Sequence, residues 1–192
     1  FGLSVNYFGE SAFNQKMIGL GFGKAFGKRF SAGLKFDYIN FKIEEYGQRN
    51  LFTFDVGFQF LAHEQLLIGA HLFNPLSINV EEAFGEDLST IMRLGLVYMP
   101  VKKVQVLAEI EKDLDFKPNF KAGISYQLVD NFYLRGGVNS YPLRGTFGFG
   151  IDWQNLRIDF AGAYRERLGF TPQLSLQLLL PKKSKSQATD LP

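Results

Sequence analysis

The sequence of 192 residues predicts an all-β protein, a transmembrane antiparallel up-and-down β-barrel. Apolar and polar residues alternate with a period of two almost from end to end, which is the pattern of two-faced strands. Tight links alternate with longer ones, and the polar face carries charges interleaved with glycine. Together these observations favour strands that cross a membrane and enclose a lumen.

The alternation is clearest in residues 29–43. One face there holds Phe30, Ala32, Leu34, Phe36 and Tyr38, and the other holds Ser31, Gly33, Lys35 and Asp37. Segments of this kind have the length of about ten residues expected of tilted membrane-spanning strands. We expect twelve of them, near residues 2–8, 15–26, 29–43, 50–61, 65–73, 90–99, 103–112, 118–128, 131–139, 144–153, 155–165 and 169–180.

The links between these segments differ in length on the two sides of the predicted sheet. Tight turns are expected at residues 27–28, 62–64, 100–102, 129–130 and 154–155, and longer links at 44–49, 75–89, 113–117, 140–143 and 166–168. Outer-membrane barrels have short periplasmic turns and long extracellular loops. The tight turns are therefore predicted to be periplasmic, together with the polar tail at 181–192, which we expect to be disordered. Residues 1–180 form the predicted barrel.

The polar face indicates which way the strands point. Large charges alternate there with glycine, whereas a water-exposed surface more often carries Ser, Thr and Lys. Such a face suits an enclosed lumen, in which glycine leaves room for longer side chains. A soluble β-protein, which would bury its apolar face inside, remains an alternative.

Composition excludes several classes of function. The 21 basic and 19 acidic residues are spread along the chain, so no basic field for nucleic acid exists. The absence of Cys excludes a disulfide scaffold, a thiolate metal site and a Cys nucleophile. No run approaches the roughly 20 apolar residues of a transmembrane helix. The chain starts at Phe1 without a signal peptide, so we expect that processing or truncation removed the true start.

Aromatic residues cluster near the ends of the expected strands, where outer-membrane barrels carry girdles at the two membrane interfaces. The predicted girdle comprises Phe26, Phe30, Phe60, Tyr98, Tyr126 and Trp153 beside the tight turns, and Tyr38 and Tyr164 toward the longer links.

Charged residues on the polar face suggest ion pairs between neighbouring strands. A two-residue turn would place Asp152 opposite Arg157, and a three-residue turn around Val101 would place Arg93 opposite Glu109. We predict a lumenal ion-pair network of Lys35, Asp37, Asp55, Arg93, Glu109, Lys121, Arg135, Asp152, Arg157 and Asp159. Catalysis by these carboxylates is the less favoured reading, because no Ser, His and acid grouping accompanies them.

Other motifs give no catalytic, cofactor or metal site. The glycines at 19, 21 and 23 alternate inside a strand, whereas a phosphate-binding loop joins a strand to a helix. His63 and His71 are the only histidines and lack further ligands at workable spacing. The protein is therefore predicted not to be an enzyme.

The longest link is the best candidate for recognition, since long barrel loops commonly carry function. It contains the candidate partner-binding residues Asn79, Glu81, Glu82, Phe84, Glu86 and Asp87. Their spacing matches no calcium-loop motif. Two interpretations of these residues follow: the acidic side chains are only solvated, or the loop binds a protein partner that contacts Phe84.

Three features carry a resemblance to a known family: the run from Ile18 to Tyr38, the segment from Ile68 to Pro75, and the glycine-aromatic repeats near Phe120, Phe147 and Leu168. In these features the chain resembles outer-membrane proteins of the PorV/PorQ type from Bacteroidota. These belong to the group shaped like long-chain fatty-acid transporters, called FadL-like. The resemblance implies a barrel of about 14 strands with an N-terminal plug segment. Two strands and the plug would then be missing here or supplied separately.

Two functions follow from this resemblance. In the first, the chain is a non-enzymatic structural or adaptor subunit of an outer-membrane assembly or type IX secretion-like complex, with lipid and protein partners in the Gram-negative outer membrane. In the second, it is a FadL-like transporter of small hydrophobic molecules. The charged polar face favours the first, since only Leu67, Phe73, Val97, Leu107 and Leu179 bring apolar side chains to that face.

Overall fold

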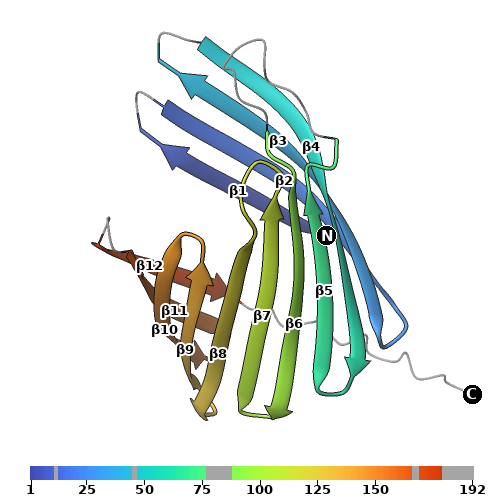
Figure 1. Ribbon diagram of the computed structural model, residues 1–192, viewed down its shortest axis with the longest axis vertical. Helices are drawn as coiled ribbons and strands as arrows, with labels where there is room; N and C mark the ends of the chain where they lie inside the picture. Colours follow the sequence, from blue (N-terminus) through green and yellow to red (C-terminus); the bar gives the residue numbers. More distant parts are fainter. Residues whose placement is uncertain (11–12, 45–46, 77–87, 166–168, 179–192) are drawn as a thin grey trace, which may run out of the picture.

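The computed structural model describes residues 1–10, 13–44, 47–76, 88–165 and 169–178. They form one sheet of 12 strands in the order β1 to β12, without a helix (Figure 1). The strands are β1 (Gly2–Gly9), β2 (Phe13–Phe26), β3 (Phe30–Ile43), β4 (Gly47–His63), β5 (Leu66–Phe73), β6 (Ile91–Val101), β7 (Val104–Asp113), β8 (Asn119–Val129), β9 (Phe132–Ser140), β10 (Leu143–Trp153), β11 (Leu156–Arg165) and β12 (Gly169–Leu178).

The expected fold class is confirmed, and each expected segment corresponds to one strand. The largest difference in the bounds is at β4, which starts at Gly47 rather than residue 50. Differences of two residues occur at the start of β2, at Phe13, and at the end of β6, at Val101. Every strand pairs antiparallel with its neighbours in the chain. None of the described segments is a helix of the length and hydropathy needed to cross a membrane.

Three irregularities in the pairing lie beside tight turns. The register shifts between Leu61 and His63, between Tyr98 and Val101, and between Gln127 and Val129. A bulge of this kind inserts an unpaired residue and increases the local twist of the strand. Added twist is therefore expected at the tight-turn ends of the hairpins β4–β5, β6–β7 and β8–β9.

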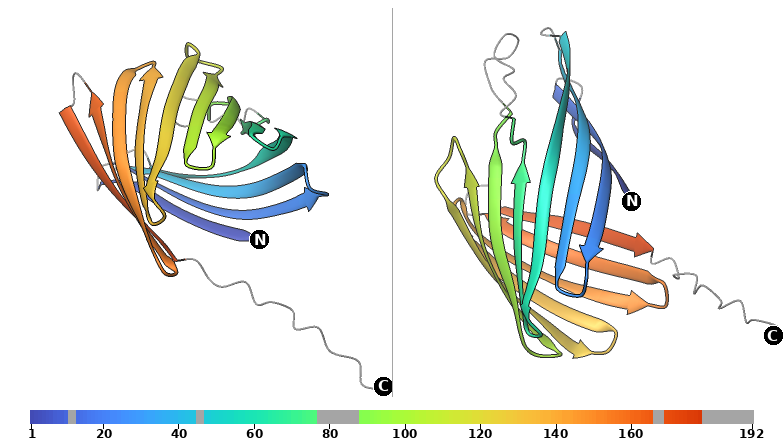
Figure 2. Two further views of the ribbon diagram at one scale, coloured as in Figure 1. Left: turned by 90° about the horizontal axis from the view of Figure 1, so that it is seen from below. Right: turned by 90° about the vertical axis from the view of Figure 1, so that its right-hand side faces the viewer.

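The sheet curls around a central space (Figure 2). Among the described residues, however, no pairing joins β1 to β12, so each of these strands has one unpaired edge. Pro172 lies in β12, and an edge strand tolerates proline because one side of its backbone needs no N–H donor.

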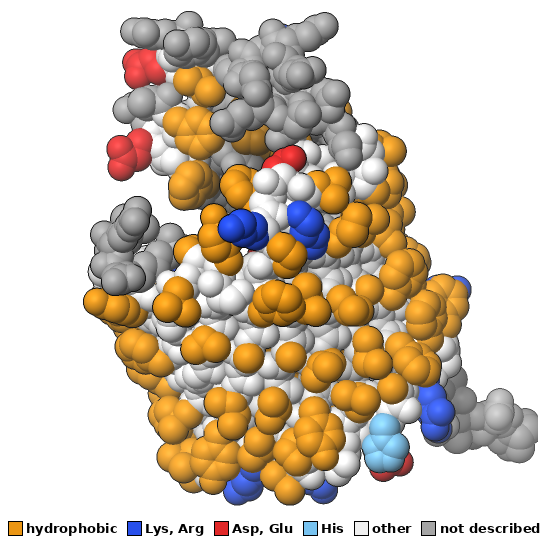
Figure 3. All heavy atoms as spheres, in the orientation of Figure 1, with side chains coloured by type: hydrophobic (Ala, Val, Ile, Leu, Met, Phe, Trp, Pro, Cys, Tyr) orange, Lys and Arg blue, Asp and Glu red, His pale blue; other side chains and the backbone are white. Residues whose placement is uncertain are grey.

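Apolar side chains cover the outer wall (Figure 3). Of the described hydrophobic residues only Ile39 and Ala163 are buried, while Phe36, Phe52 and Leu94 are among the many that remain exposed. Soluble proteins rarely expose contiguous apolar surface on this scale. The wall has instead the character of a surface that faces lipid, which counts against the soluble β-protein alternative.

Candidate functional site

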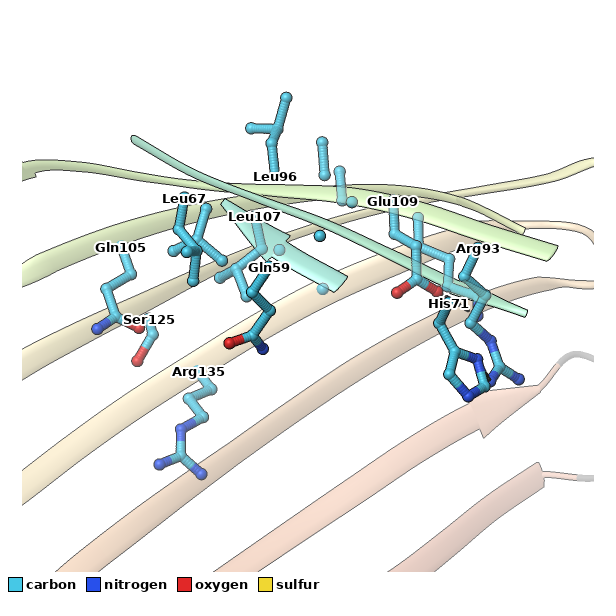
Figure 4. A pocket seen from close by; sticks show the side chains of 18 of the residues that line it. Gln59, Leu67, His71, Arg93, Leu96, Gln105, Leu107, Glu109, Ser125 and Arg135 are labelled. Atoms are coloured by element: carbon cyan, nitrogen blue, oxygen red, sulfur yellow. Dashed lines mark hydrogen bonds and ion pairs between the residues drawn. The ribbon is translucent and has the colours of Figure 1, made fainter. Parts of the chain in front are cut away.

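The concave side of the sheet encloses a cavity of about 1340 Å³, lined by residues from β2 to β11. The close-up in Figure 4 shows the side chains of Gln59, Arg93 and Arg135 on the cavity side, while Leu96 points away on the other side of the sheet. Because successive strand residues face opposite sides, the charged alternate positions line the lumen and the apolar ones form the outer wall.

A chain of charged side chains begins on β3. Lys35 Nζ lies 3.2 Å from Asp37 Oδ2 and 2.9 Å from Asp55 Oδ2 on β4. Lys35 and Asp55 are direct cross-strand partners, and Asp37 lies two positions along β3. The side chain of Asp37 is buried, and Lys35 is the cation that offsets its charge. Asp55 continues the chain toward β5, where its Oδ2 lies 3.6 Å from Nε2 of His71.

The chain continues from β5 to β8. His71 Nδ1 lies 3.5 Å from Nη1 of Arg93 on β6, and Arg93 Nε donates a hydrogen bond of 2.6 Å to Glu111 Oε2 on β7. Lys121 Nζ on β8 reaches Glu111 at 2.7 Å and Glu109 at 2.9 Å. Eight side chains thus form one connected chain of polar contacts across six adjacent strands.

A second cluster of charges lies on β9, β10 and β11. Arg157 donates two hydrogen bonds to the carboxylate of Asp152, at 2.5 and 2.8 Å, which is the bidentate geometry that strengthens such pairs. Arg135 pairs with Asp159 at 2.5 Å. The guanidinium groups of Arg157 and Arg135 lie 5.5 and 5.9 Å from the ring centre of Tyr133, so one aromatic ring holds both cations close together.

A strip of bare backbone lines the same cavity on β2, β3 and β4. Gly23, Gly33 and Gly57 are consecutive partners in the register of these strands. A methyl group added at Gly57 would meet its nearest neighbours at 3.9 Å, which is ordinary contact. Close packing therefore does not require glycine there, and its effect is to widen the lumen.

An apolar row crosses β5, β6 and β7 on the lumenal side. Leu67 pairs with Val97, and Val97 pairs with Leu107. In Figure 4, Leu67 and Leu107 lie on the same side of the sheet as Gln59. The sequence placed these three apolar residues on the polar face, and the register now brings them together.

Asn74 joins the two ends of the long link between β5 and β6. It is fully buried; its side chain donates to the backbone oxygen of Leu88 at 2.5 Å and accepts from Thr53 at 2.9 Å. Its backbone oxygen accepts from the Thr90 hydroxyl at 2.7 Å. Asn74 also has a φ of 49°, a left-handed conformation that Asn adopts more readily than most residues. The link is thereby attached to the lumenal wall at both ends.

All ten residues named for the lumenal network take part in the ion pairs described above. One expected pairing was wrong, because Arg93 lies opposite Glu111 and Glu109 lies opposite Gly95. The tight turn comprises Lys102 and Lys103, which alone would move the partner of Arg93 by three positions relative to a three-residue turn around Val101. The bulge between Tyr98 and Val101 moves it back by one, so the net shift is two positions.

The eight predicted girdle residues lie on the outer face. Phe26, Phe30 and Phe60 form one row across β2, β3 and β4, and Phe26 and Phe30 have ring centres 5.8 Å apart. Tyr98, Tyr126 and Trp153 lie near the tight-turn ends of β6, β8 and β10, and Tyr38 and Tyr164 lie toward the longer links.

The candidate partner loop, with Asn79, Glu81, Glu82, Phe84, Glu86 and Asp87, lies outside the described residues, and so does the polar tail. Among the residues that the structure describes, no group of three or more His, Cys, Asp or Glu is arranged to hold a metal ion.

Sequence reasoning missed Glu111, His71 and Tyr133 as members of the charged clusters. The alternation places Glu111 and His71 on the polar face, but which residues they contact depends on the register of the strands. Tyr133 lies two positions before Arg135 and therefore on the same face of β9. This spacing could have placed Tyr133 in the lumen, but it does not indicate that its ring contacts two arginines.

No protein-family model matches the chain, and no curated protein matches it. A solved KdgM porin in complex with disordered oligogalacturonate has a similar structure, with a TM-score of 0.55 at 10% identity over 88% of this chain and 93% of that chain. A triple mutant of the Rh. blastica porin aligns with a TM-score of 0.47 at 5% identity over 85% of this chain and 79% of the other. The first similarity shows an outer-membrane β-barrel fold, and neither comparison singles out the PorV/PorQ type or the FadL-like group.

Proposed function

We propose that this protein is a non-enzymatic outer-membrane channel whose lumen admits small polar solutes. The observation that carries the proposal is the lumenal wall itself, in which charged side chains of both clusters and a strip of bare glycines line one cavity of about 1340 Å³. The charged lining residues of the two clusters are Arg93, Glu109, Lys121, Arg135, Arg157 and Asp159. The ion-paired side chains on this wall remain partly exposed, so that water can hydrate them, and full burial of a charge is costly. Water beside them is also the medium through which a polar solute would pass.

The same arrangement supports an outer-membrane location. The apolar outer wall would contact lipid, and the tight turns would face the periplasm, as in other barrels with short turns on one side. The proposed channel is a closed barrel of about 14 strands, formed by the described strands and two further ones.

Uptake of small hydrophobic molecules is the second candidate function. The row of Leu67, Val97 and Leu107 favours it, because these side chains offer an apolar contact inside an otherwise polar lumen. The adaptor role in a secretion complex stays a prediction, since its candidate loop lies outside the described residues. Co-purification of partner proteins in detergent would support the adaptor role, and loading of vesicles with a fluorescent fatty acid would support uptake.

Single-channel recording tests the channel directly. The full-length protein in a planar lipid bilayer should conduct potassium chloride, and Gly57→Trp should lower the conductance because the new side chain projects into the lumen. The matched control is Val56→Trp, at the adjacent position on the outer face, which should leave conductance unchanged. Conductance no higher than that of the empty bilayer would contradict the proposal.

A further inference from the structure

We propose that the lumen prefers anions, and that the guanidinium groups of Arg93, Arg135 and Arg157 are the groups that attract them. This inference rests on the proposed channel function and names the class of solute. Small carboxylates and phosphates are the expected ligands, because the planar guanidinium group binds both in a bidentate manner.

A count of formal charges gives no reason to expect this preference. Among the residues that the structure describes, the ion pairs of the lumen contain five basic and six acidic side chains, apart from His71. On that count alone the lumen would be nearly neutral with a slight preference for cations.

Exposure reverses the expectation from that count. Lys35 is 33% exposed, whereas its partners Asp37 and Asp55 are 0% and 10% exposed. Arg135 is 40% exposed against 17% for Asp159. The basic side chain is also the more exposed partner in Arg93–Glu111, Lys121–Glu111 and Arg157–Asp152, and only Lys121–Glu109 shows the opposite order.

The difference matters because a solute interacts most strongly with the groups it can touch. The attraction between two charges falls with their separation, and water and salt screen it beyond about 10 Å. An anion can approach the exposed guanidinium groups directly, while the carboxylates beneath hold those groups in place. A cation has less access to the acidic groups, of which only Glu109 is more exposed than its basic partner in the described pairs.

Arg135 and Arg157 form the strongest point of the proposed site. They come from β9 and β11, and both lie over the ring of Tyr133. Two cations held at one ring can share a ligand with two anionic groups. A small dicarboxylate is therefore the ligand that should bind most tightly at this end of the lumen.

Reversal potentials in a potassium chloride gradient test the preference in the full-length protein. The native protein should pass chloride in preference to potassium. Arg135→Gln should lower the permeability ratio by about twofold, the order expected when one exposed unit charge is lost beside the solute path. Arg135→Lys should keep the preference. Lys102→Gln is the matched control, because it removes the same charge from the exposed β6–β7 turn instead of the lumen.

A second measurement separates this inference from the proposed function. Titration of malonate into the detergent-solubilised protein should show binding that Arg135→Gln weakens, and malonate should reduce the chloride current. A conducting channel with equal or cation-favouring permeability would overturn the anion preference alone. Malonate binding without conductance would overturn the channel and support the anion site, and absence of both would overturn both. Heat-dependent migration on gels establishes that each variant is folded.

Discussion

At the scale of single residues, glycine has two opposite roles in this sheet. Gly23, Gly33 and Gly57 leave space in the lumen. Gly162 does the reverse on the outer wall, where the stacked rings of Phe147 and Phe170 occupy the space that a side chain would need. Aromatic rings that cover a strand glycine restore the apolar contact that the glycine lacks.

Gly162→Ala should therefore destabilise the protein, by about 0.5–1.5 kcal/mol, because the new methyl group pushes the ring of Phe170 away and disturbs its stacking on Phe147. Gly136→Ala is the matched control on the same outer face, since its nearest non-neighbouring atom would lie 4.0 Å from the added carbon. Urea unfolding in detergent, followed by the fluorescence of Trp153, measures both. Equal midpoints for the two variants would contradict the assigned role of the rings.

The charged positions could be predicted from the sequence because the period of two assigns every second residue to one face. The partner of a given charge could not always be predicted in this way. Asp152 meets Arg157 across a two-residue turn as expected, whereas Arg93 meets Glu111 instead of Glu109. Pairing depends on register, and register depends on which residues form the turn and on any bulge beside it.

At the scale of the elements, two tight turns each contain a residue with positive φ. In the hairpin of β10 and β11, Gln154 has a φ of 54°, a left-handed conformation that costs an ordinary residue about 1–2 kcal/mol. Gly27 meets the same demand in the β2–β3 turn without a side chain, at a φ of 71°.

Gln154→Gly should consequently stabilise the hairpin and raise the free energy of unfolding by about 1 kcal/mol. Asp130→Gly in the β8–β9 turn is the control, because Asp130 is not among the residues with positive φ and gains nothing from glycine. The temperature at which the folded band disappears on gels compares the two. A lower transition temperature for Gln154→Gly than for the native protein would count against the argument.

The strands themselves were predictable because each is long, two-faced and bounded by turn residues. The bulges and the early start of β4 were not, since they depend on twist and on pairing with neighbouring strands. The anchoring by Asn74 was also beyond prediction, because its partners are distant in the sequence: Thr53 lies on β4 and Thr90 directly precedes β6.

At the scale of the whole molecule, the sheet separates two environments. One side is apolar and the other is charged along strand after strand, so a residue changes environment when the chain advances by a single position. The chain contains no Cys, which makes this sidedness measurable with single introduced thiols.

Ser125→Cys on the lumenal face of β8 should react with a charged, water-soluble maleimide in lipid vesicles, while Ile124→Cys should not. The reason is that lipid would cover position 124 and water would reach position 125. Both variants should react equally after denaturation, which is the control. Equal labelling in vesicles would contradict a lipid-facing outer wall.

The directions of the two edge strands restrict how many strands a closed barrel of this kind can have. Strands β1 and β12 run in opposite directions, because the sheet has 12 strands and every pairing between neighbours is antiparallel. They can meet directly or across an even number of added strands, whereas an odd number would force one parallel seam, which short hairpin links do not provide. In evolution, barrels of this design should therefore gain or lose girth by whole hairpins, and the bore should change in steps of two strands.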